Sequence, residues 1–146
     1  MKLLPSCMTA ALILALSGCA IDQRIERSES FSEKEICVVE NPDVQSSFLE
    51  AYERVLLKRA YSVRRLPATS NLRECPITST YTANWSWDIF LYMSYANIRI
   101  YKTGHEIGSA TYDSTHGGGN FGKFISAESK INELTEKLLA QEPVNK

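Results

Sequence analysis

Residues 36–43 read Ile36-Cys37-Val38-Val39-Glu40-Asn41-Pro42-Asp43, and the architecture of the chain can be derived outward from this run. Its first four residues are apolar on both alternating faces, which is typical of a strand covered on both sides. Asn41 is a capping residue type, Pro42 suits the first helical position, and Asp43 is favourable near a helix N-terminus. The run therefore predicts a central strand followed directly by a helix.

The helix predicted from Asn41 extends to about Arg59. It carries one apolar stripe at helical spacing, formed by Val44, Phe48, Ala51, Tyr52, Val55 and Leu56. Ala60 follows, at a position where a glycine would end the helix more comfortably. Residues 61–66 then carry apolar side chains up to Pro67, which predicts a second strand. This order of strand, helix and strand is a βαβ unit.

Three more strands and a second helix are predicted downstream. Residues 79–87 alternate with a period of two, and residues 89–113 are expected to form an antiparallel hairpin around a turn at Thr103-Gly104. Asn120 is predicted to cap the last helix, whose stripe comprises Phe124, Ala127, Ile131, Leu134 and Leu138. These elements predict an α+β fold, a two-layer sandwich in the order β-α-β-β-β-β-α. A mixed sheet of about five strands would carry both helices on one face.

The segment before the domain has the layout of a secretory signal. Lys2 gives it a positive start, an apolar run spans 9–16, and Leu16-Ser17-Gly18-Cys19 forms a lipobox. We therefore expect residues 1–18 to be removed as a lipoprotein signal peptide and Cys19 to carry the lipid. The run is too short for a membrane-spanning helix, which needs roughly 20 residues. By resemblance to sorted lipoproteins of diderm bacteria, Ala20 in place of Asp implies an outer-membrane address facing the periplasm, with surface display as the alternative.

The mature chain divides into three parts. Residues 19–34 mix charges of both signs with few apolar side chains, which predicts a tether that reaches roughly 45 to 50 Å when extended. A short amphipathic strand or helix is the alternative. Residues 35–140 are expected to form a single α+β domain, and the polar residues 141–146 a frayed tail.

Charge and cysteine count narrow the classes of function. With 16 basic and 17 acidic residues the formal net charge is −1, and the absence of a basic face argues against nucleic-acid binding. If Cys7 is lost with the signal and Cys19 is lipidated, Cys37 and Cys75 remain. In an oxidising periplasm this pair predicts a disulfide that holds the loop of residues 67–76 against the sheet. Two buried free thiols are the alternative.

Three segments carry a resemblance to a known family. Residues 36–42, 75–88 and 117–125 resemble the Sbal-type lipoproteins, an uncharacterised family of small proteobacterial lipoproteins, over most of the mature chain. The βαβ start and the aromatic hairpin are similar, at the level of fold, to lipoprotein domains of the curli-secretion and penicillin-binding-protein-activator kind. Neither resemblance implies catalytic residues, because a fold does not carry a function with it.

The sequence contains few residue patterns that are typical of a nucleotide, metal or catalytic site. Gly117, Gly122 and Lys123 have phosphate-loop spacing, but Phe124 stands where a magnesium-binding Ser or Thr belongs, so we expect no nucleotide and a capped flexible loop instead. A nest of backbone amides for a small anion is an intermediate alternative. His105 and His116 are the two histidines, and neither has a second ligand at metal spacing, so no metal or other cofactor is expected. Ser114, His116 and Asp113 share one loop, which rarely gives triad geometry.

Aromatic side chains gather around one hairpin. Trp85 and Trp87 share a strand face and are predicted to lie under the helices, with display for a sugar or protein partner as the alternative. Leu91, Met93, Tyr95 and Tyr101 are predicted on the opposite face, which would mark an interface if it is uncovered. The candidate interaction surface comprises Tyr95, Tyr101, His116, Gly117, Gly118 and Gly119.

Together these features predict a non-enzymatic accessory lipoprotein of the cell envelope. Its expected partners are the membrane, through the lipid anchor, and another envelope protein. A binding module for cell-wall glycan or a small ligand is the alternative, and an enzyme comes third.

Overall fold

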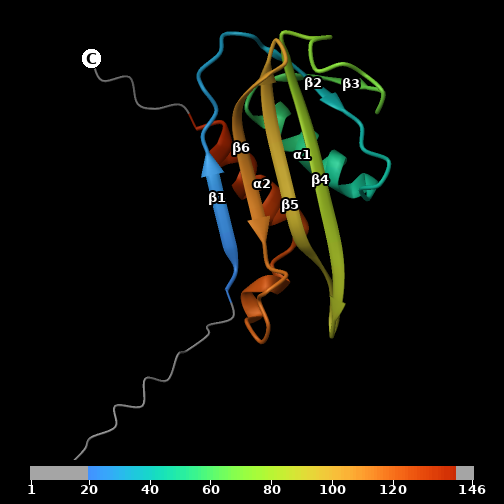
Figure 1. Ribbon diagram of the computed structural model, residues 1–146, viewed down its shortest axis with the longest axis vertical. Coiled ribbons are helices and arrows are strands. Elements are labelled where there is room, and N and C mark those ends of the chain that lie inside the picture. The colour runs from blue at the N-terminus through green and yellow to red at the C-terminus, as the bar shows by residue number, and fades with distance from the viewer. Residues whose placement is uncertain (1–19, 141–146) are drawn as a thin grey trace, which may run out of the picture.

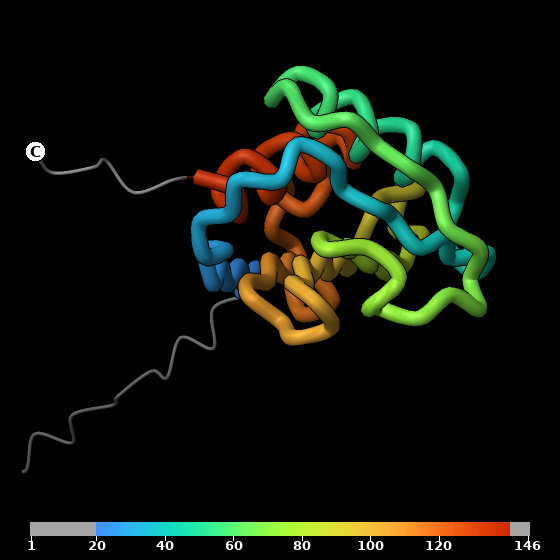
Figure 2. Tube along the Cα trace, turned by 90° about the horizontal axis from the view of Figure 1, so that it is seen from above, coloured from blue at the N-terminus to red at the C-terminus, as the bar shows by residue number. Residues whose placement is uncertain are grey.

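The computed structural model describes residues 20–140, in which two helices cover one face of a six-stranded sheet. In chain order the elements are β1 (Asp22–Glu26), β2 (Glu35–Val39), α1 (Ser46–Lys58), β3 (Ser62–Leu66), β4 (Ile77–Asp88), β5 (Phe90–Lys102), β6 (His105–Asp113), the 3-10 helix η1 (Phe121–Phe124) and α2 (Ala127–Leu138). The strand order is β1-β6-β5-β4-β2-β3. Figure 1 and Figure 2 show the strands in one layer and both helices in the other. The α+β sandwich is confirmed, with six strands in place of about five.

The predicted βαβ unit is present. Ile36, Cys37 and Val38 of β2 are all fully buried, and β2 pairs in parallel with β3 on one side and with β4 on the other. Ile36 and Val38 pack under α1, whereas Cys37 points to the other face, where the loop of residues 67–76 covers it. The strand is therefore buried on both faces, as its continuous apolar sequence indicated.

Both helices begin later than predicted. Asn41 Oδ1 accepts a hydrogen bond from the amide of Asp43 (3.1 Å), which closes a turn ahead of α1, and α1 itself begins at Ser46. In the same way Asn120 Oδ1 accepts from the amide of Gly122 (2.9 Å) at the start of η1, and the cap of α2 is Ser126. An asparagine closes a local turn as readily as it caps a helix, so the residue type alone does not decide between the two.

Strands β4, β5 and β6 form an antiparallel meander that contains the predicted hairpin. Ala96, Ile98 and Ile100 of β5 are fully buried beneath the helices. A bulge between Asn84 and Trp85 shifts the pairing, so that Trp85 lies opposite Met93. The prediction that Met93 shares a face with Tyr95 is therefore wrong: Met93 is buried in the core, because the extra residue reverses the alternation.

The predicted tether is wrong over residues 22–26, which form the edge strand β1, paired antiparallel with β6. Ile21 and Ile25 lie on one side of this strand and pack against the core. Gln23 lies between them, and its side chain donates to Glu133 of α2 (2.9 Å). Two isoleucines at this spacing bury enough apolar surface to hold the segment, which is the amphipathic strand left as the alternative.

The predicted disulfide joins Cys37 and Cys75 across 38 positions. It holds the loop of residues 67–76 against the sheet face opposite the helices. Within residues 20–140, no helix has the length and apolar character to cross a bilayer. The predicted signal peptide (residues 1–18), the lipidated Cys19 and the tail (residues 141–146) lie outside the described residues.

Candidate functional site

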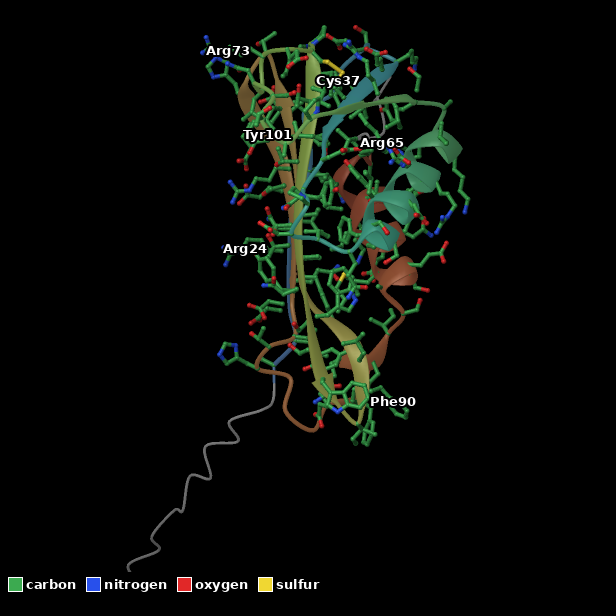
Figure 3. The ribbon with its side chains drawn as sticks, turned by 90° about the vertical axis from the view of Figure 1, so that its right-hand side faces the viewer. Arg24, Cys37, Arg65, Arg73, Phe90 and Tyr101 are labelled. Atoms are coloured by element: carbon green, nitrogen blue, oxygen red, sulfur yellow. A yellow bond between two sulfur atoms is a disulfide. The ribbon has the colours of Figure 1, made fainter. Side chains whose placement is uncertain are left out.

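The sheet face opposite the helices carries a polar surface outside the part covered by the loop of residues 67–76, and we call this surface the open face. It is formed by side chains that alternate with the buried ones: Arg24 of β1, Thr80 and Thr82 of β4, Tyr95, Asn97, Arg99 and Tyr101 of β5, and Ser109 and Thr111 of β6. Figure 3 shows Arg24 and Tyr101 pointing away from the helices. Of the predicted interaction residues, Tyr95 and Tyr101 are part of this face.

A hydrogen-bonded chain fixes the centre of the open face. Asn97 donates to Thr111 (2.8 Å), and Arg99 Nε donates to Asn97 Oδ1 (2.9 Å). Arg99 Nη1 also donates to Glu106 (3.3 Å). A hydrogen bond with Tyr101 and the nearby Glu106 carboxylate raise the pKa of Arg99, so this side chain stays cationic. The face thus presents ordered donors between two half-buried tyrosines, which is suited to hydrogen bonding and ring stacking.

The remaining predicted residues lie in the loop after β6, away from Tyr101. His116 Nδ1 lies 3.2 Å from the hydroxyl oxygen of Thr115, which itself donates to Asp113 (2.5 Å). The Thr115 hydroxyl and amide lower the pKa of Asp113. Ser114 is buried and donates to the carbonyl of Ser94 (3.2 Å), so it does not join His116 in a triad. The predicted surface is therefore two surfaces, because Tyr101 and this loop lie toward opposite ends of β5 and β6.

The glycine-rich loop is held by its own backbone. The amide of Gly117 donates to Ser114 (2.9 Å), that of Asn120 to Gly117 (2.8 Å), and that of Lys123 to Asn120 (3.2 Å). Lys123 is 4% exposed, and its ammonium donates to Asp88 and to the carbonyl of Gly118. The amides that a phosphate would use are thus taken up by turns within the loop, and the lysine instead fastens the loop to Asp88 at the β4–β5 turn.

Most of the exposed large hydrophobic residues among residues 20–140 gather at that same turn, in a surface that we call the apolar tip. Its members are more than a third exposed: Trp87 (76%), Ile89 (65%), Phe90 (63%), Leu91 (57%), Phe121 (78%) and Ile125 (38%). Trp85 is partly buried against the core, but the predicted burial of Trp87 is wrong, because β4 extends past the helices. The apolar residues on both sides of Asp88 are the sequence signal for this surface, since turn tips are usually polar.

The apolar tip is ordered by aromatic packing. Phe124 of η1 stands edge-on to Phe90 (ring centroids 5.8 Å apart) and to Tyr92 (5.3 Å). Beside these rings, Trp85, Leu91 and Ile125 help to line a groove of about 350 Å³. Ile89, at the turn itself, has φ +61°, a conformation that a β-branched residue rarely adopts.

A second groove, of about 450 Å³, opens at the carboxyl ends of β2 and β3. It is lined in part by Glu40, Asn41, Arg65 and Tyr81. Ligands of open α/β sheets bind at this kind of position. Here, however, Arg65 makes two hydrogen bonds of 2.6 Å to Glu53, and the hydroxyl of Tyr81 accepts from the amide of Asn41 (3.1 Å). Arg65, Asn41 and Tyr81 therefore already have partners within the chain.

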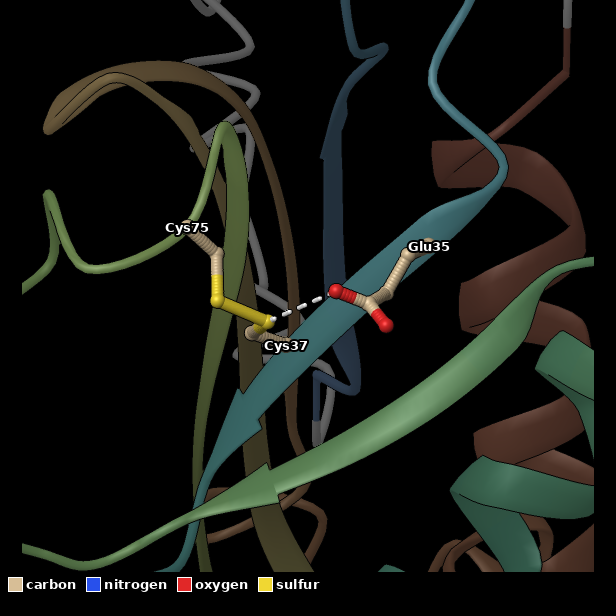
Figure 4. Close-up of side chains that lie close together, drawn as sticks. All are labelled: Glu35, Cys37 and Cys75. Carbon is tan, nitrogen blue, oxygen red and sulfur yellow. Dashed lines mark hydrogen bonds between the residues drawn. A yellow bond between two sulfur atoms is a disulfide. The ribbon is translucent and has the colours of Figure 1, made fainter.

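The one cluster of metal-ligand residue types among residues 20–140 is Glu35, Cys37 and Cys75. Figure 4 shows the two sulfurs bonded to each other beside the Glu35 side chain. Glu35 Oε1 lies 3.8 Å from Cys37 Sγ. Arg64 lies against the same group, with Nη2 at 2.9 Å from Cys75 Sγ and 3.2 Å from Glu35. In the disulfide the sulfurs have no thiolate to offer, so this cluster is an ion pair packed on a disulfide.

Comparison with known proteins identifies the fold. No family model matches the chain, and no curated protein gives a significant match. A PelC dodecamer from Paraburkholderia phytofirmans matches with a TM-score of 0.59 and 16% identity, over 82% of this chain and 99% of the PelC chain. A substituted PelC dodecamer from the same organism matches with a TM-score of 0.57 and 15% identity over the same shares. At these identities the likeness shows the fold alone, and the resemblance to Sbal-type lipoproteins stays a prediction.

Proposed function

We propose that this chain is a lipid-anchored accessory protein of the cell envelope, held in the outer membrane facing the periplasm, which acts by binding and not by catalysis. The observation that carries this proposal is the lipobox cysteine, Cys19, placed just ahead of the folded domain. The buried Cys37–Cys75 disulfide supports an oxidising compartment, where such bonds persist.

The anchor is tested by analysing the amino terminus of the protein purified from cells. We expect the chain to begin at Cys19, to carry fatty acids and to fractionate with membranes. The Cys19→Ala variant should lose the fatty acids and the cleavage. A purified chain that begins at Met1, or that remains in aqueous fractions without fatty acid, contradicts the proposal.

The open face is the surface that we assign to a protein partner. Its side chains are ordered before binding by the Arg99 and Asn97 hydrogen bonds, which lowers the entropy cost of association. The partner is another envelope protein or further copies of this chain, and the second possibility is supported by the dodecameric state of the PelC neighbours.

A photoreactive amino acid at Tyr95, introduced in growing cells, tests this assignment. We expect a discrete crosslinked adduct, whose mass distinguishes a different protein from a second copy of the chain. The same group at Lys58, an exposed position on α1, is the matched control and should give no such adduct. Equal adducts from both positions would show that the open face has no special role.

A cell-wall glycan is the second candidate ligand, and one observation favours it. Tyr95 and Tyr101 lie on the same face as the Asn97 and Arg99 donors, an arrangement that allows sugar rings to stack while their hydroxyls are hydrogen-bonded. Purified peptidoglycan should then retain the protein, and Tyr101→Ala should weaken retention several-fold. Retention that is unchanged by Tyr101→Ala argues against this candidate.

A further inference from the structure

The apolar tip lies at the end of the molecule where the described chain begins. In Figure 1 the chain enters β1 at the same end as the β4–β5 turn and η1. The contacts agree with this view, because the Ile21 side chain lies 3.4 Å from the position that a Cβ on Gly122 would occupy. Gly122 belongs to η1, whose Phe121 and Phe124 are part of the apolar tip or pack against it.

Little chain separates the tip from the expected anchor. Since residues 22–26 are a strand and not a tether, Ala20 and Ile21 alone stand between Cys19 and β1. Two residues, and the bonds to their neighbours, reach roughly 10 Å at most. A lipid on Cys19 would therefore hold this end of the domain at the bilayer surface.

The chemistry of the tip also suits a lipid surface. In residues 84–95 and 117–126 the charged side chains are Asp88 and Lys123, and these two form an ion pair with the lysine buried. The tip thus presents no unpaired charge. Exposed tryptophan and phenylalanine beside a tyrosine are the side chains that settle at membrane interfaces.

We propose that the apolar tip inserts into the lipid leaflet that holds the Cys19 anchor, as a second attachment of the same chain. This inference rests on the anchor proposed above. The lipid supplies the affinity, and the side chains of Trp87, Phe90 and Phe121 fix the orientation. The long axis of β4 and β5 then stands away from the membrane, and the open face is presented sideways to partners in the periplasm.

Tryptophan fluorescence offers a direct test, because Trp85 and Trp87 are the two tryptophans in the chain. In Trp85→Phe, Trp87 is the single reporter. The lipidated variant is purified from membranes and reconstituted in vesicles of phosphatidylethanolamine and phosphatidylglycerol, with and without lipids brominated on the acyl chain. We expect Trp87 emission to shift to shorter wavelength than in detergent-free buffer, to be largely quenched by the brominated lipid, and to resist quenching by acrylamide.

The matched control places the reporter far from the tip. Leu57→Trp, combined with Trp85→Phe and Trp87→Phe, puts one tryptophan at an exposed position on α1. This reporter should be quenched by acrylamide and not by brominated lipid. Since Trp85→Phe removes a partly buried ring, a second measurement uses the unsubstituted protein: a lipid with a photoreactive acyl chain should crosslink within residues 87–91 and 121–125.

Each other outcome overturns the proposal in a distinguishable way. If the protein floats with vesicles but Trp87 remains accessible to acrylamide, the anchor stands and the tip does not insert. If Trp87 is protected from acrylamide yet insensitive to brominated lipid, the tip is covered by protein. If the purified protein carries no fatty acid and fails to float, the anchor proposal itself is wrong and the inference falls with it.

Discussion

At the residue scale, two buried tyrosines differ in whether their hydroxyl is satisfied. Tyr52 Oη lies 2.8 Å from Ser79 Oγ, and burial raises the pKa of Tyr52. Tyr112 is equally buried, but its hydroxyl has no hydrogen-bond partner within residues 20–140. An unsatisfied buried hydroxyl costs free energy, whereas a satisfied one contributes about 1 kcal/mol.

We therefore predict opposite effects of the same substitution. Tyr112→Phe should leave the free energy of unfolding unchanged or raise it by up to about 1 kcal/mol, and Tyr52→Phe should lower it by about 1 kcal/mol. Urea unfolding of both variants measures the difference. A larger loss in Tyr112→Phe than in Tyr52→Phe would show that the Tyr112 hydroxyl has a partner in solution.

Glu133 gives the fold a pH dependence. Hydrogen bonds from Lys130, Lys137 and Gln23 lower the pKa of Glu133 from 4.5 to about 2. Because the folded state prefers the carboxylate, this stabilisation is fully present above the unfolded pKa of 4.5 and is lost as the pH falls from about 5 toward 2.

The prediction is that Glu133→Gln lowers the free energy of unfolding by about 1 kcal/mol at pH 7. The expected loss is this small because Glu133 and Lys137 are partly exposed, so that solvent screens their interaction. The difference from the unsubstituted protein should shrink as the pH falls from about 5 toward 2, because the Glu133 carboxyl takes up a proton over this range and is about half protonated in the folded state near pH 2. Glu128→Gln, in a more exposed ion pair with Arg54, is the control and should change little at either pH. A loss that stays constant with pH would rule out the carboxylate as its cause.

Sequence reasoning places correctly the residues that a count or a local pattern decides. The pairing of Cys37 with Cys75 follows from elimination of the other two cysteines, and the burial of Ile36 and Val38 follows from their continuous apolar run. Trp87 was misplaced, because its face of β4 was predicted correctly but the helices stop short of it. The alternation along a strand predicts which face a side chain lies on. It does not predict how far along the strand a helix covers that face, because this depends on how the elements pack.

At the element scale, the end of α1 carries a conformational cost. Ala60, immediately after the Arg59 C-cap, has φ +63°, in the left-handed region where a Cβ is unfavourable. The sequence already indicated this position as one for glycine, and the backbone confirms that indication.

Ala60→Gly should raise the free energy of unfolding by about 0.5 to 1 kcal/mol, after the greater chain entropy of glycine is subtracted. Glu50→Gly, at an exposed position inside α1, should lower it by about 1 kcal/mol. Thermal melting of the two variants checks the difference in sign. A loss of stability in both would show that Ala60 is not left-handed in solution.

The pairing of β1 was missed for a reason that its sequence hides. Five residues with three charges bury little surface alone, and the partners of Gln23 lie more than 100 residues away on α2. Gly108 of β6 allows the next segment to dock, since a Cβ there would lie 2.5 Å from Cα of Ser28. Such contacts are visible only once the sheet is assembled.

Gly108→Ala should therefore lower the free energy of unfolding by about 1 to 3 kcal/mol. The new Cβ would collide with backbone atoms of Ser28, which cannot rotate away as a flexible side chain can. Gly119→Ala is the matched control: its Cβ would meet nothing within 4 Å, and we expect a change within about 0.5 kcal/mol. Hydrogen exchange adds a local measurement, and the amides of residues 22–29 should lose protection in Gly108→Ala. Unchanged protection there would contradict the role of this close approach.

At the scale of the whole molecule, one covalent bond joins the loop of residues 67–76 to the sheet. The Cys37–Cys75 disulfide closes a loop of 38 positions, which on a chain-entropy model stabilises the fold by about 4 kcal/mol. Replacing both cysteines with alanine should lower the free energy of unfolding by an amount of this order, and reductant should destabilise the native protein but not the double variant. Equal stability of the native protein with and without reductant would show that the bond is dispensable.

The placement of β1 also determines how the molecule bears force. A lipid at Cys19 would transmit any pull to Asp22, the first residue of β1, in a direction along the strand. β1 and β6 are paired at five positions, from Asp22 opposite Asp113 to Glu26 opposite Ser109. Under a force along the strand these pairs are loaded together, in shear, and do not break one after another. An edge strand joined to the anchor in this way serves as a mechanical clamp, so that tension between the membrane and a bound partner reaches the sheet before it can peel the domain open.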